Sequence, residues 1–338
     1  MSTLKTVVIG RNEGDRLITC FDSVLAQLSN PNQIVYVDSG STDDSDKVAE
    51  KRSISTIYLD NSAPFTAARG RNAGWRWLCQ NESTPEYIQF IDGDCELVEG
   101  WLDKATAFLD THPQVAVVCG RRRERYPDAS PYNLLADMEW DTPVGQTMAC
   151  GGDALIRTEA LQSVGGYNSS LICGEEPEMC IRLGRQGWQI YRLDADMTLH
   201  DMDMFHFRQW WKRSIRGGWA VAEGVANYGT PPEKYMVREH RSGWLWGLLL
   251  PLFAITLAMI SRGASLGILL LYPLLAWRIY GYRSQQRGYM SNHAFVYASF
   301  CTLSKFPQML GQASYWLTRW QGKTATLIEY KSAVKSKF

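Results

Sequence analysis

The chain has 338 residues, of which 45% are hydrophobic, and it contains 13 Trp and 16 Tyr. This composition excludes intrinsic disorder and leaves room for one large domain plus an appendage. Lys plus Arg equals Asp plus Glu at 35 each, so no net field indicates a nucleic-acid partner. The eight cysteines are dispersed, with no Cys-x-x-Cys pair, and no secretory signal peptide opens the sequence. We therefore expect reduced thiols in a cytosolic setting.

In the first hundred residues, short apolar runs alternate with stretches whose apolar residues recur at helical spacing. Each apolar run is rich in β-branched or aromatic residues and stops at a polar turn. The predicted strands are 6–9, 33–37, 55–59 and 87–92, with helices over 17–28 and 65–79. Repeated βα units place the carboxyl ends of their strands along one edge of a parallel sheet. The sequence thus predicts an α/β fold of Rossmann type, with a mostly parallel sheet and flanking helices.

The fourth strand stops abruptly at Asp92-Gly93-Asp94. Carboxylate oxygens are the ligands that Mg²⁺ and Mn²⁺ prefer, and ligands of α/β sheets bind at this edge. A solvated Asp-Gly turn explains the same three residues equally well. The triplet alone leaves a cation site and a turn both open.

Polar residues also follow the other predicted strands. Helix caps account for each loop taken singly, because Ser, Thr and Asp cap helices generally. Caps do not explain why four successive strand ends carry chemically useful side chains. The side chains in question are Glu13, Asp38, Arg71 with Asn72, and Asp92 with Asp94.

Taken together, these stretches resemble the family-two nucleotide-sugar glycosyltransferases of the GT-A fold. The resemblance covers about residues 3–225, and the ordered set is far more specific than any one member. The matching stretches are Val8-Ile9-Gly10-Arg11-Asn12-Glu13, Val37-Asp38-Ser39-Gly40-Ser41-Thr42-Asp43, Ala68-Arg69-Gly70-Arg71-Asn72-Ala73-Gly74, Phe90-Ile91-Asp92-Gly93-Asp94, Gly165-Gly166-Tyr167, the segment 174–183 and His200.

The resemblance implies a nucleoside-diphosphate sugar donor, with UDP-sugar as the default, and Mn²⁺ or Mg²⁺ as cofactor. It implies that Asp94 and His200 hold the metal, and that Asp92, a further candidate metal ligand, lies between the donor's ribose and the metal. Asp38 would face the nucleobase, although many relatives have a second acid where Ser39 stands. The residues left to frame the nucleotide are Arg11, Glu13, Arg71 and Asn72. Sugar transfer requires the charge of the departing pyrophosphate to be neutralised, and a divalent ion does this efficiently.

An acidic pair, Glu175 and Glu176, precedes an amphipathic helical stretch. Negative charge is stabilised at a helix N-terminus, which would by itself explain the pair. In the family the second acid, usually aspartate, deprotonates the acceptor hydroxyl. The resemblance therefore implies that Glu176 is the general base, with Glu175 as its backup. One base opposite the departing diphosphate predicts inversion at the anomeric carbon.

Three further sets of residues carry weaker indications. The basic run 121–125 predicts an exposed charged turn or strand end, with an acceptor-phosphate or membrane site as the alternative. Asp153 matches a family segment near the donor sugar and is a candidate sugar-hydroxyl ligand, although a turn carboxylate is equally consistent. Arg213 and Arg216 are candidates for contact with the diphosphate. Gln209-Trp210-Trp211-Lys212-Arg213 departs from the Gln-x-x-Arg-Trp of processive synthases, which favours a single-addition transferase.

Beyond about residue 240 the composition becomes apolar. The segments 244–260 and 264–277 carry no charge, and Arg238, Arg241, Arg278, Arg283 and Arg287 flank them. We expect a helical hairpin over about 244–280 in a bacterial inner membrane, with both ends and the catalytic domain facing the cytoplasm by the positive-inside rule. Two buried core helices are the alternative. Pro251 and Pro273 predict kinks.

The segment 293–320 mixes aromatic residues and cations, which predicts an amphipathic interfacial helix, or otherwise a partner-binding or oligomerisation helix. The expected domains are a catalytic domain over 1–228 and a membrane-associated helical region over 229–338. The predicted function is transfer of a sugar, with inversion, to a lipid-linked or other membrane-proximal glycan acceptor in polysaccharide biosynthesis. The alternatives are a processive polysaccharide synthase, a catalytically silent nucleotide-sugar-binding partner of a membrane complex, and a nucleotidyltransferase.

Overall fold

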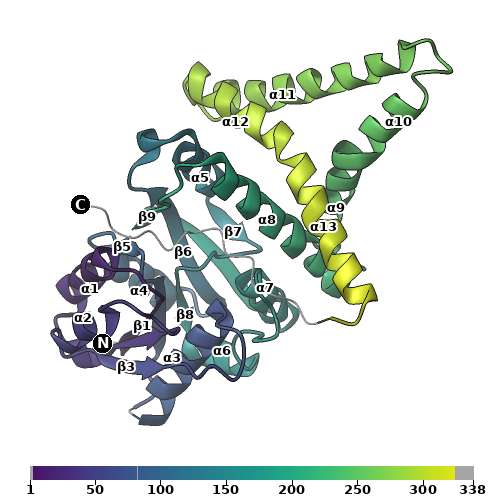
Figure 1. Ribbon diagram of the computed structural model, residues 1–338. Helices are drawn as coiled ribbons and strands as arrows, with labels where there is room; N and C mark the ends of the chain where they lie inside the picture. The colour runs from purple at the N-terminus through teal and green to yellow at the C-terminus, as the bar shows by residue number, and fades with distance from the viewer. Residues whose placement is uncertain (1–2, 82, 324–338) are drawn as a thin grey trace. The chain divides into compact units, whose positions relative to one another are not determined.

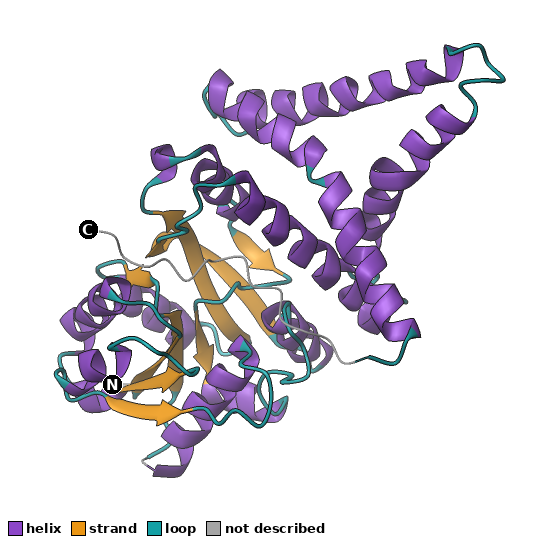
Figure 2. Ribbon diagram, viewed as in Figure 1, coloured by secondary structure: helices purple, strands orange, loops and turns teal. Residues whose placement is uncertain are grey.

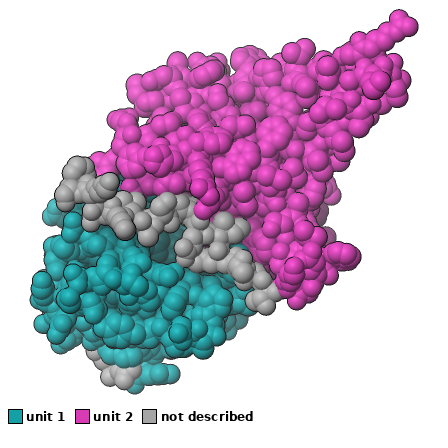
Figure 3. Space-filling view, viewed as in Figure 1, with its two compact units in different colours: residues 1–125, 139–202 teal, residues 126–138, 203–338 magenta. Residues whose placement is uncertain are grey.

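The computed structural model describes residues 3–81 and 83–323, and by contacts these form two compact units (Figures 1 and 3). Unit 1 comprises residues 1–125 and 139–202, and unit 2 comprises 126–138 and 203–338. The expected boundary at residue 228 stays a prediction for the catalytic domain. In the structure, the long helix that ends there is grouped with the C-terminal helices.

Unit 1 is built on a nine-stranded sheet (Figure 2). Eight strands follow the order β3-β2-β1-β4-β8-β6-β9-β5, and β7 pairs with β9. The first four in this order are parallel, β8 is antiparallel to both of its neighbours, and β6 and β9 are parallel. The strands are β1 Leu4–Gly10, β2 Ile34–Asp38, β3 Ser55–Tyr58, β4 Tyr87–Asp92, β5 Cys95–Leu97, β6 Val115–Glu124, β7 Gly145–Thr147, β8 Ala154–Arg157 and β9 Gln189–His200. The predicted α/β class and all four N-terminal strands are confirmed.

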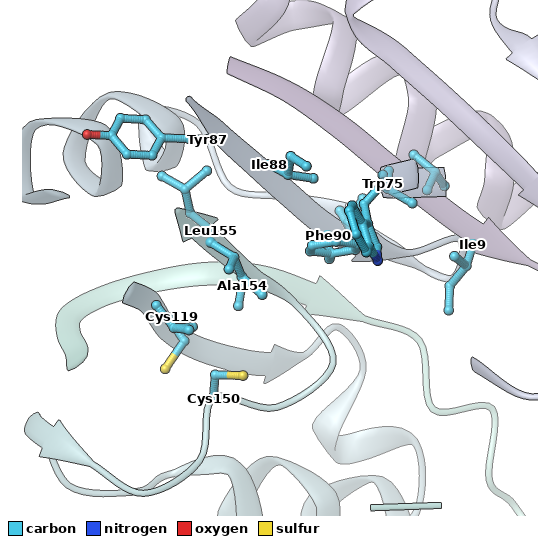
Figure 4. Close-up of a cluster of buried hydrophobic side chains, with 14 of the residues drawn as sticks. Ile9, Trp75, Tyr87, Ile88, Phe90, Cys119, Cys150, Ala154 and Leu155 are labelled. Carbon is cyan, nitrogen blue, oxygen red and sulfur yellow. The ribbon is translucent and has the colours of Figure 1, made fainter. Parts of the chain in front are cut away.

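The register of the parallel strands brings their polar ends together. Gly10 of β1 is opposite Asp38 of β2, and Ile9 is opposite Asp92 of β4. The strands themselves are buried, with Val7 and Phe90 at 0% exposure, and Phe90 lies in the core cluster of Figure 4. The shared edge that the βα pattern predicted is therefore present.

Helices flank the sheet of unit 1. Gly74 of α3 shows how closely one of them approaches, since a Cβ there would lie 2.4 Å from Cγ1 of Val7 in β1. The helices are α1 Asp15–Leu28, α2 Ser45–Glu50, α3 Ala67–Asn81, α4 Trp101–Thr111, α6 Thr158–Ser163 and α7 Glu175–Arg185, with a 3₁₀ turn, η1, at Pro31–Gln33. The predicted helices over 17–28 and 65–79 correspond to α1 and α3.

Of the exposed charged turn or strand end predicted for the basic run 121–125, the structure has the strand end, and its residues are half-buried or buried. Residues 121–124 continue β6, and Arg122 and Arg123 pair in register with Thr198 and Leu199 of β9. Sheet pairing decides this, because the run has its partner strand some 75 residues later in the chain. The alternation of the strand turns Arg122 inward, where its side chain is 17% exposed.

Unit 2 consists of helices. Its tightest contact lies between α8 and α13, where Gly218 and Gly311 allow the backbones to approach. A Cβ on either glycine would lie 2.0 Å from a carbonyl oxygen of the other helix, that of Gln308 or Ile215. The elements are η2 Pro127–Ala129, α5 Pro131–Trp140 (whose last two residues belong to unit 1), α8 Phe207–Tyr228, α9 Val237–Trp244, η3 Leu245–Leu249, α10 Leu250–Thr256, η4 Ala264–Leu270, α11 Leu271–Gly281, η5 Tyr282–Gln286, α12 Ser291–Leu303 and α13 Lys305–Trp320.

The two apolar segments near the C-terminus form a helical hairpin. Helical structure runs from α9 to α10, reverses over residues 257–263, and continues from η4 to η5. A π-helical stretch precedes Pro251 and a 3₁₀ stretch precedes Pro273, as expected where proline removes a backbone donor. Within the described residues, the span Ala264–Gln286 is long and apolar enough to cross a membrane.

The segment 293–320, predicted to be amphipathic, lies in two helices, α12 and α13. Part of α13 packs inside unit 2, because Pro307, Gly311, Gln312 and Tyr315 are buried. Leu310, Leu317 and Trp320 remain exposed. The apolar side of this segment is therefore divided between intramolecular packing and the surface, which the sequence did not predict.

Candidate active site

The loops after β1 and β2 are tied to each other by hydrogen bonds. The backbone N–H of Asn12 donates to Oγ of Ser41 at 3.0 Å, and the N–H of Thr42 donates to Oδ1 of Asn12 at 2.7 Å. Arg11 lies over the ring of Phe65, and Glu13 forms an ion pair with Arg16 at 3.0 Å. Arg11 and Glu13 thus border a fixed double loop at the predicted sheet edge.

Asp38 is held by its own loop. Its Oδ1 accepts hydrogen bonds from the backbone N–H groups of Gly40 and Ser41 at 2.8 and 2.7 Å. Its Oδ2 accepts one from the hydroxyl of Tyr36 at 3.0 Å, and the residue is buried. The carboxylate therefore shapes the loop, and its predicted contact with a nucleobase stays a prediction.

Arg71 joins two predicted parts of the site. Its Nη2 lies 2.8 Å from Oδ1 of Asp92, and its Nη1 lies 2.6 Å from Oε1 of Glu175. Arg71 is 3% exposed, and its guanidinium lies over the ring of Tyr167. Burial opposes the charged form, but the carboxylates of Asp92 and Glu175 outweigh it and raise the pKa of Arg71. The end of β4 and the start of α7 are thus linked by one buried cation.

Asn72, a predicted donor-binding residue, contacts protein groups on every side. Its Nδ2 donates to the carbonyl of Tyr167 at 2.7 Å and to Oγ of Ser169 at 3.0 Å. Its Oδ1 accepts from the backbone N–H of Tyr167 and from Nε1 of Trp75, both at 2.9 Å. These bonds anchor the loop before α7, which gives Asn72 a structural role.

Arg122 adds a second cation that the sequence analysis left out of the site. Its Nη2 lies 3.2 Å from Oδ2 of Asp92 and 2.7 Å from Oδ2 of Asp153. Asp153 is completely buried and also accepts from the N–H of Asp92 at 3.0 Å and from Oγ1 of Thr198 at 2.7 Å. We call Arg71, Arg122, Asp92, Asp153 and Glu175 the ionic network. Asp153 is thus engaged with protein groups and fixes the backbone of Asp92.

Gly152 passes directly against this network. A Cβ at that position would lie 2.7 Å from Nη2 of Arg71 and 2.9 Å from Oδ2 of Asp92. A glycine at this position is therefore needed for the close packing of the two arginines and Asp92.

The two arginines compensate Asp92. Burial by itself would raise the pKa of Asp92, but the guanidinium groups of Arg71 and Arg122 outweigh that effect and lower it. Asp92 therefore carries a negative charge that the protein already balances.

Asp94 lies instead beside a histidine. Its Oδ2 is 3.3 Å from Nε2 of His200, and both side chains are less than a tenth exposed. Nδ1 of His200 lies 3.7 Å from Oε2 of Glu124, and Trp140 packs edge-on against the imidazole. Ligand atoms of Asp94, Cys95 and His200 all lie within 4.8 Å of one another. The arrangement brings the two predicted metal ligands, Asp94 and His200, together.

The donor set fits a divalent ion. Two ligand atoms that each lie about 2.1 Å from a cation are about 3 Å apart when they meet at a right angle, close to the Asp94–His200 separation. Glu124 lies on the other side of the imidazole, but at 3.7 Å its Oε2 is beyond hydrogen-bond distance of Nδ1.

Glu175 and Glu176 open α7, as predicted, and they differ in environment. Glu175 is buried against Arg71, whereas Glu176 is partly exposed. Burial of the carboxyl group, followed by the charge of Glu175, raises the pKa of Glu176 to about 7. Glu176 can therefore accept a proton near neutral pH, while Glu175 is paired.

The family comparison agrees with this geometry. Residues 6–164 match the family model described as Glycosyl transferase family 2. These residues form a family 2 glycosyl transferase domain. The match includes the ends of β1, β2 and β4 together with Arg122 and Asp153, and it stops before α7 and His200.

Two curated relatives of this family 2 domain are similar to the chain. Glycosyltransferase AglE of Haloferax volcanii is 23% identical over 53% of this chain and 60% of its own length. Succinoglycan biosynthesis protein ExoA of Rhizobium meliloti is 27% identical over 59% of this chain and 63% of its own length. The matches thus span about three fifths of either relative.

A solved structure shares the fold. The mannosyltransferase PcManGT from Pyrobaculum calidifontis, solved with GDP-Man and Mn²⁺, superposes with a TM-score of 0.57 at 18% identity. The match covers 89% of this chain and 86% of that one. The expected GT-A-like fold of the family 2 domain is therefore confirmed.

Most of the acids at the site are predictable from the sequence, whereas several of their partners are not. Arg122 was noted only as part of a basic run, and Glu124, Cys95 and Thr198 were not considered. Their signal was strand alternation, which places every second residue of β6 and β9 on the same face of the sheet. Arg213 and Arg216 lie on α8 in unit 2, and their contact with a diphosphate stays a prediction.

Proposed function

We propose that this protein is a metal-dependent, inverting glycosyltransferase that uses a nucleoside-diphosphate sugar. The observation that carries the proposal is the placement of unlike acids within one connected site. Arg71 joins Asp92 to Glu175, Asp94 faces His200, and Glu176 has a pKa of about 7. Transfer of a sugar from a nucleoside diphosphate needs a cation site, a fixed donor site and a general base, and these residues offer all three.

Asp94 and His200 would hold Mn²⁺ or Mg²⁺. The bound ion would neutralise charge that develops on the departing diphosphate. Trp140 packs edge-on against the His200 ring and Glu124 lies on the side of Nδ1, so the imidazole is enclosed by protein groups. UDP-sugar is the donor that the family resemblance favours, with GDP-sugar as the first alternative.

Arg71 and Arg122 keep Asp92 ionised and fixed beside the donor. Glu176 removes the proton from the acceptor hydroxyl, which attacks the anomeric carbon while the nucleoside diphosphate leaves from the opposite face. One displacement by one base inverts the anomeric centre. The pairing of Glu175 with Arg71 leaves Glu176 as the base, so Glu175 positions rather than reacts.

The acceptor in this proposal is a lipid-linked or other membrane-proximal glycan in polysaccharide biosynthesis, with the protein on the cytoplasmic face of a bacterial inner membrane. The apolar span Ala264–Gln286 and its flanking arginines support that location. Attachment beside the lipid would keep acceptor and catalytic domain within reach of each other.

The test is transfer and donor hydrolysis by the full-length protein with Mn²⁺ or Mg²⁺ and a panel of UDP- and GDP-sugars. Glu176→Gln should abolish transfer while retaining donor binding, because it keeps the shape and removes the base. Asp94→Asn should weaken both the response to metal and turnover. Glu159→Gln, an exposed acid at the start of α6, is the matched control and should behave as wild type.

Two outcomes would redirect the assignment. If donor binds and neither Glu176→Gln nor Asp94→Asn alters turnover, the assigned chemistry is wrong. If wild type binds donor and transfers nothing to any acceptor extract, a silent nucleotide-sugar-binding partner is the better description. Product length separates single addition from processive synthesis, and NMR of the product's anomeric proton tests inversion.

A further inference from the structure

The hairpin of unit 2 is apolar where it is most exposed. Met259 and Ile260, in its turn, are 93% and 82% exposed. Its arms expose further large apolar side chains along their length. They are Leu249, Leu252, Phe253 and Ile255 on one arm, and Leu266, Leu270, Leu274 and Trp277 on the other. An exposed apolar patch this continuous marks an interaction surface.

Both arms return to the same group of helices. The arm that begins with α9 contacts α13 near its start, and α11 contacts α12 near its end. In Figure 1 the two arms meet at the turn and separate toward α12 and α13. The ends of the hairpin therefore share one side of unit 2, and the turn lies farthest from them.

The uncharged arms cover most of a bilayer core. The uncharged helical residues 244–256 extend roughly 20 Å at about 1.5 Å per helical residue, and the apolar turn residues 257–260 continue beyond them. The stretch 264–277 extends roughly 25 Å, because its first half is the more extended 3₁₀ helix η4. The hydrocarbon core is about 30 Å thick, so each uncharged arm covers more than half of it and the apolar turn adds to that length.

The positions of the charged residues indicate how deeply the turn enters the bilayer. Arg262 is exposed at the turn, directly after the apolar tip. An arginine held at the bilayer centre is strongly disfavoured, whereas at the far surface it binds lipid phosphates. A hairpin that entered only one leaflet would leave Arg262 near that centre. Arginines at the other ends of both arms fix those ends at the near surface.

We propose that the hairpin crosses the whole bilayer, with Arg262 anchored in the headgroups of the far leaflet and both arms ending on the catalytic side. The occupant of the exposed apolar surface is thus lipid. This inference rests on the proposed membrane attachment and not on sugar transfer, so each can fail while the other stands.

The test places single cysteines on the full-length chain in bacterial spheroplasts. The background carries Cys79→Ser and Cys301→Ser, because the other six cysteines are buried. Ala264→Cys lies beside the turn and Gln285→Cys lies at the other end of the same arm, and both positions are exposed. The probe is a membrane-impermeant maleimide added to intact or permeabilised spheroplasts.

We expect Ala264→Cys to react in intact spheroplasts and Gln285→Cys only after permeabilisation. Met259→Cys serves as a second reporter of the turn, and labelling in denaturing detergent gives the total for each variant. If Ala264→Cys and Met259→Cys react only after permeabilisation or only in detergent, the hairpin does not cross and the proposal is overturned. Release of the protein by an alkaline carbonate wash would also overturn it and would favour a protein partner on this surface.

Arg262→Leu separates the anchor from the apolar arms. Without the charge, nothing holds the turn at the far surface, so labelling at Ala264→Cys should fall severalfold while membrane attachment persists. Arg262→Lys should retain labelling, since a lysine also binds lipid phosphates. Unchanged labelling of the leucine variant would refute the anchoring role of Arg262.

Discussion

Asp92 and Asp94 stand two residues apart at the end of one strand, yet the protein treats them differently. Asp92 belongs to the ionic network, where two arginines that are permanently charged neutralise it. Asp94 lies beside His200, and the two belong to a group of ligand atoms that could hold a metal ion. The ionic network is therefore a charge-balanced, structural part of the site. The region around Asp94 is instead suited to bind a cation.

The first way to break this contrast is to remove a cation from the network. Arg122→Met leaves the fully buried Asp153 without its charged partner, which typically costs about 3–5 kcal/mol. We expect a large drop in the midpoint of thermal unfolding measured by circular dichroism. Arg185→Met, at an exposed position on α7, should change it little.

Adding Asp153→Asn to Arg122→Met tests the cause. The double variant should recover part of the lost stability, because the uncompensated charge is gone. A double variant that is less stable than the single one would count against an uncompensated charge as the cause of the lost stability and would favour loss of the arginine's packing.

The second prediction compares the two acids directly. Asp94→Asn should weaken Mn²⁺ binding and lower kcat by about 10²–10³-fold, the usual effect of losing one strong electrostatic contact at the reacting charge. Asp92→Asn should retain Mn²⁺ binding and lower the unfolding midpoint, since it removes a carboxylate that the two arginines share. Electron paramagnetic resonance of free Mn²⁺ measures the binding, and equal loss of metal affinity in both variants would remove the distinction between them.

Much of this site follows from the sequence because its acids lie at strand ends and at a helix start. The βα repeat places Asp38 and Asp92 on one edge, and Glu175 lies where a helix favours negative charge. Their partners do not follow, since local sequence does not show contacts across long separations. Arg71 and Glu175 are about a hundred residues apart in the sequence. Arg122 lies in the site only because β6 pairs with β8 and β9.

The pH dependence of kcat/KM tests whether Glu176, at the start of α7, is the general base. Because burial and Glu175 raise the pKa of Glu176 to about 7, kcat/KM should fall about tenfold per pH unit below that value as the base becomes protonated. Glu176→Asp should retain some activity with a displaced profile, and Glu176→Gln none. A wild-type rate that stays flat from pH 8 to pH 5 would exclude Glu176 as the base.

Stability should change in the opposite sense. A carboxyl group with a raised folded pKa favours the folded state while it is protonated, and this contribution is lost as pH rises from the unfolded value toward about 7. The Glu176→Gln variant has no carboxyl group to ionise at this position. The difference in stability between variant and wild type should therefore favour the variant more at pH 8 than at pH 5. Unfolding midpoints of both proteins at the two pH values measure the difference.

The smallest expected effect concerns Asp38, whose carboxylate is held by neutral donors rather than by arginines. Tyr36→Phe removes the hydroxyl that donates to Oδ2 and should cost about 1 kcal/mol of stability, the net value of a typical hydrogen bond. The two backbone donors on Oδ1 remain, so the loop should keep its shape and donor affinity should change less than threefold. A larger loss of donor affinity, measured by calorimetry, would show that the Tyr36 hydroxyl reaches the nucleotide itself, which would place Asp38 and Tyr36 together in base recognition.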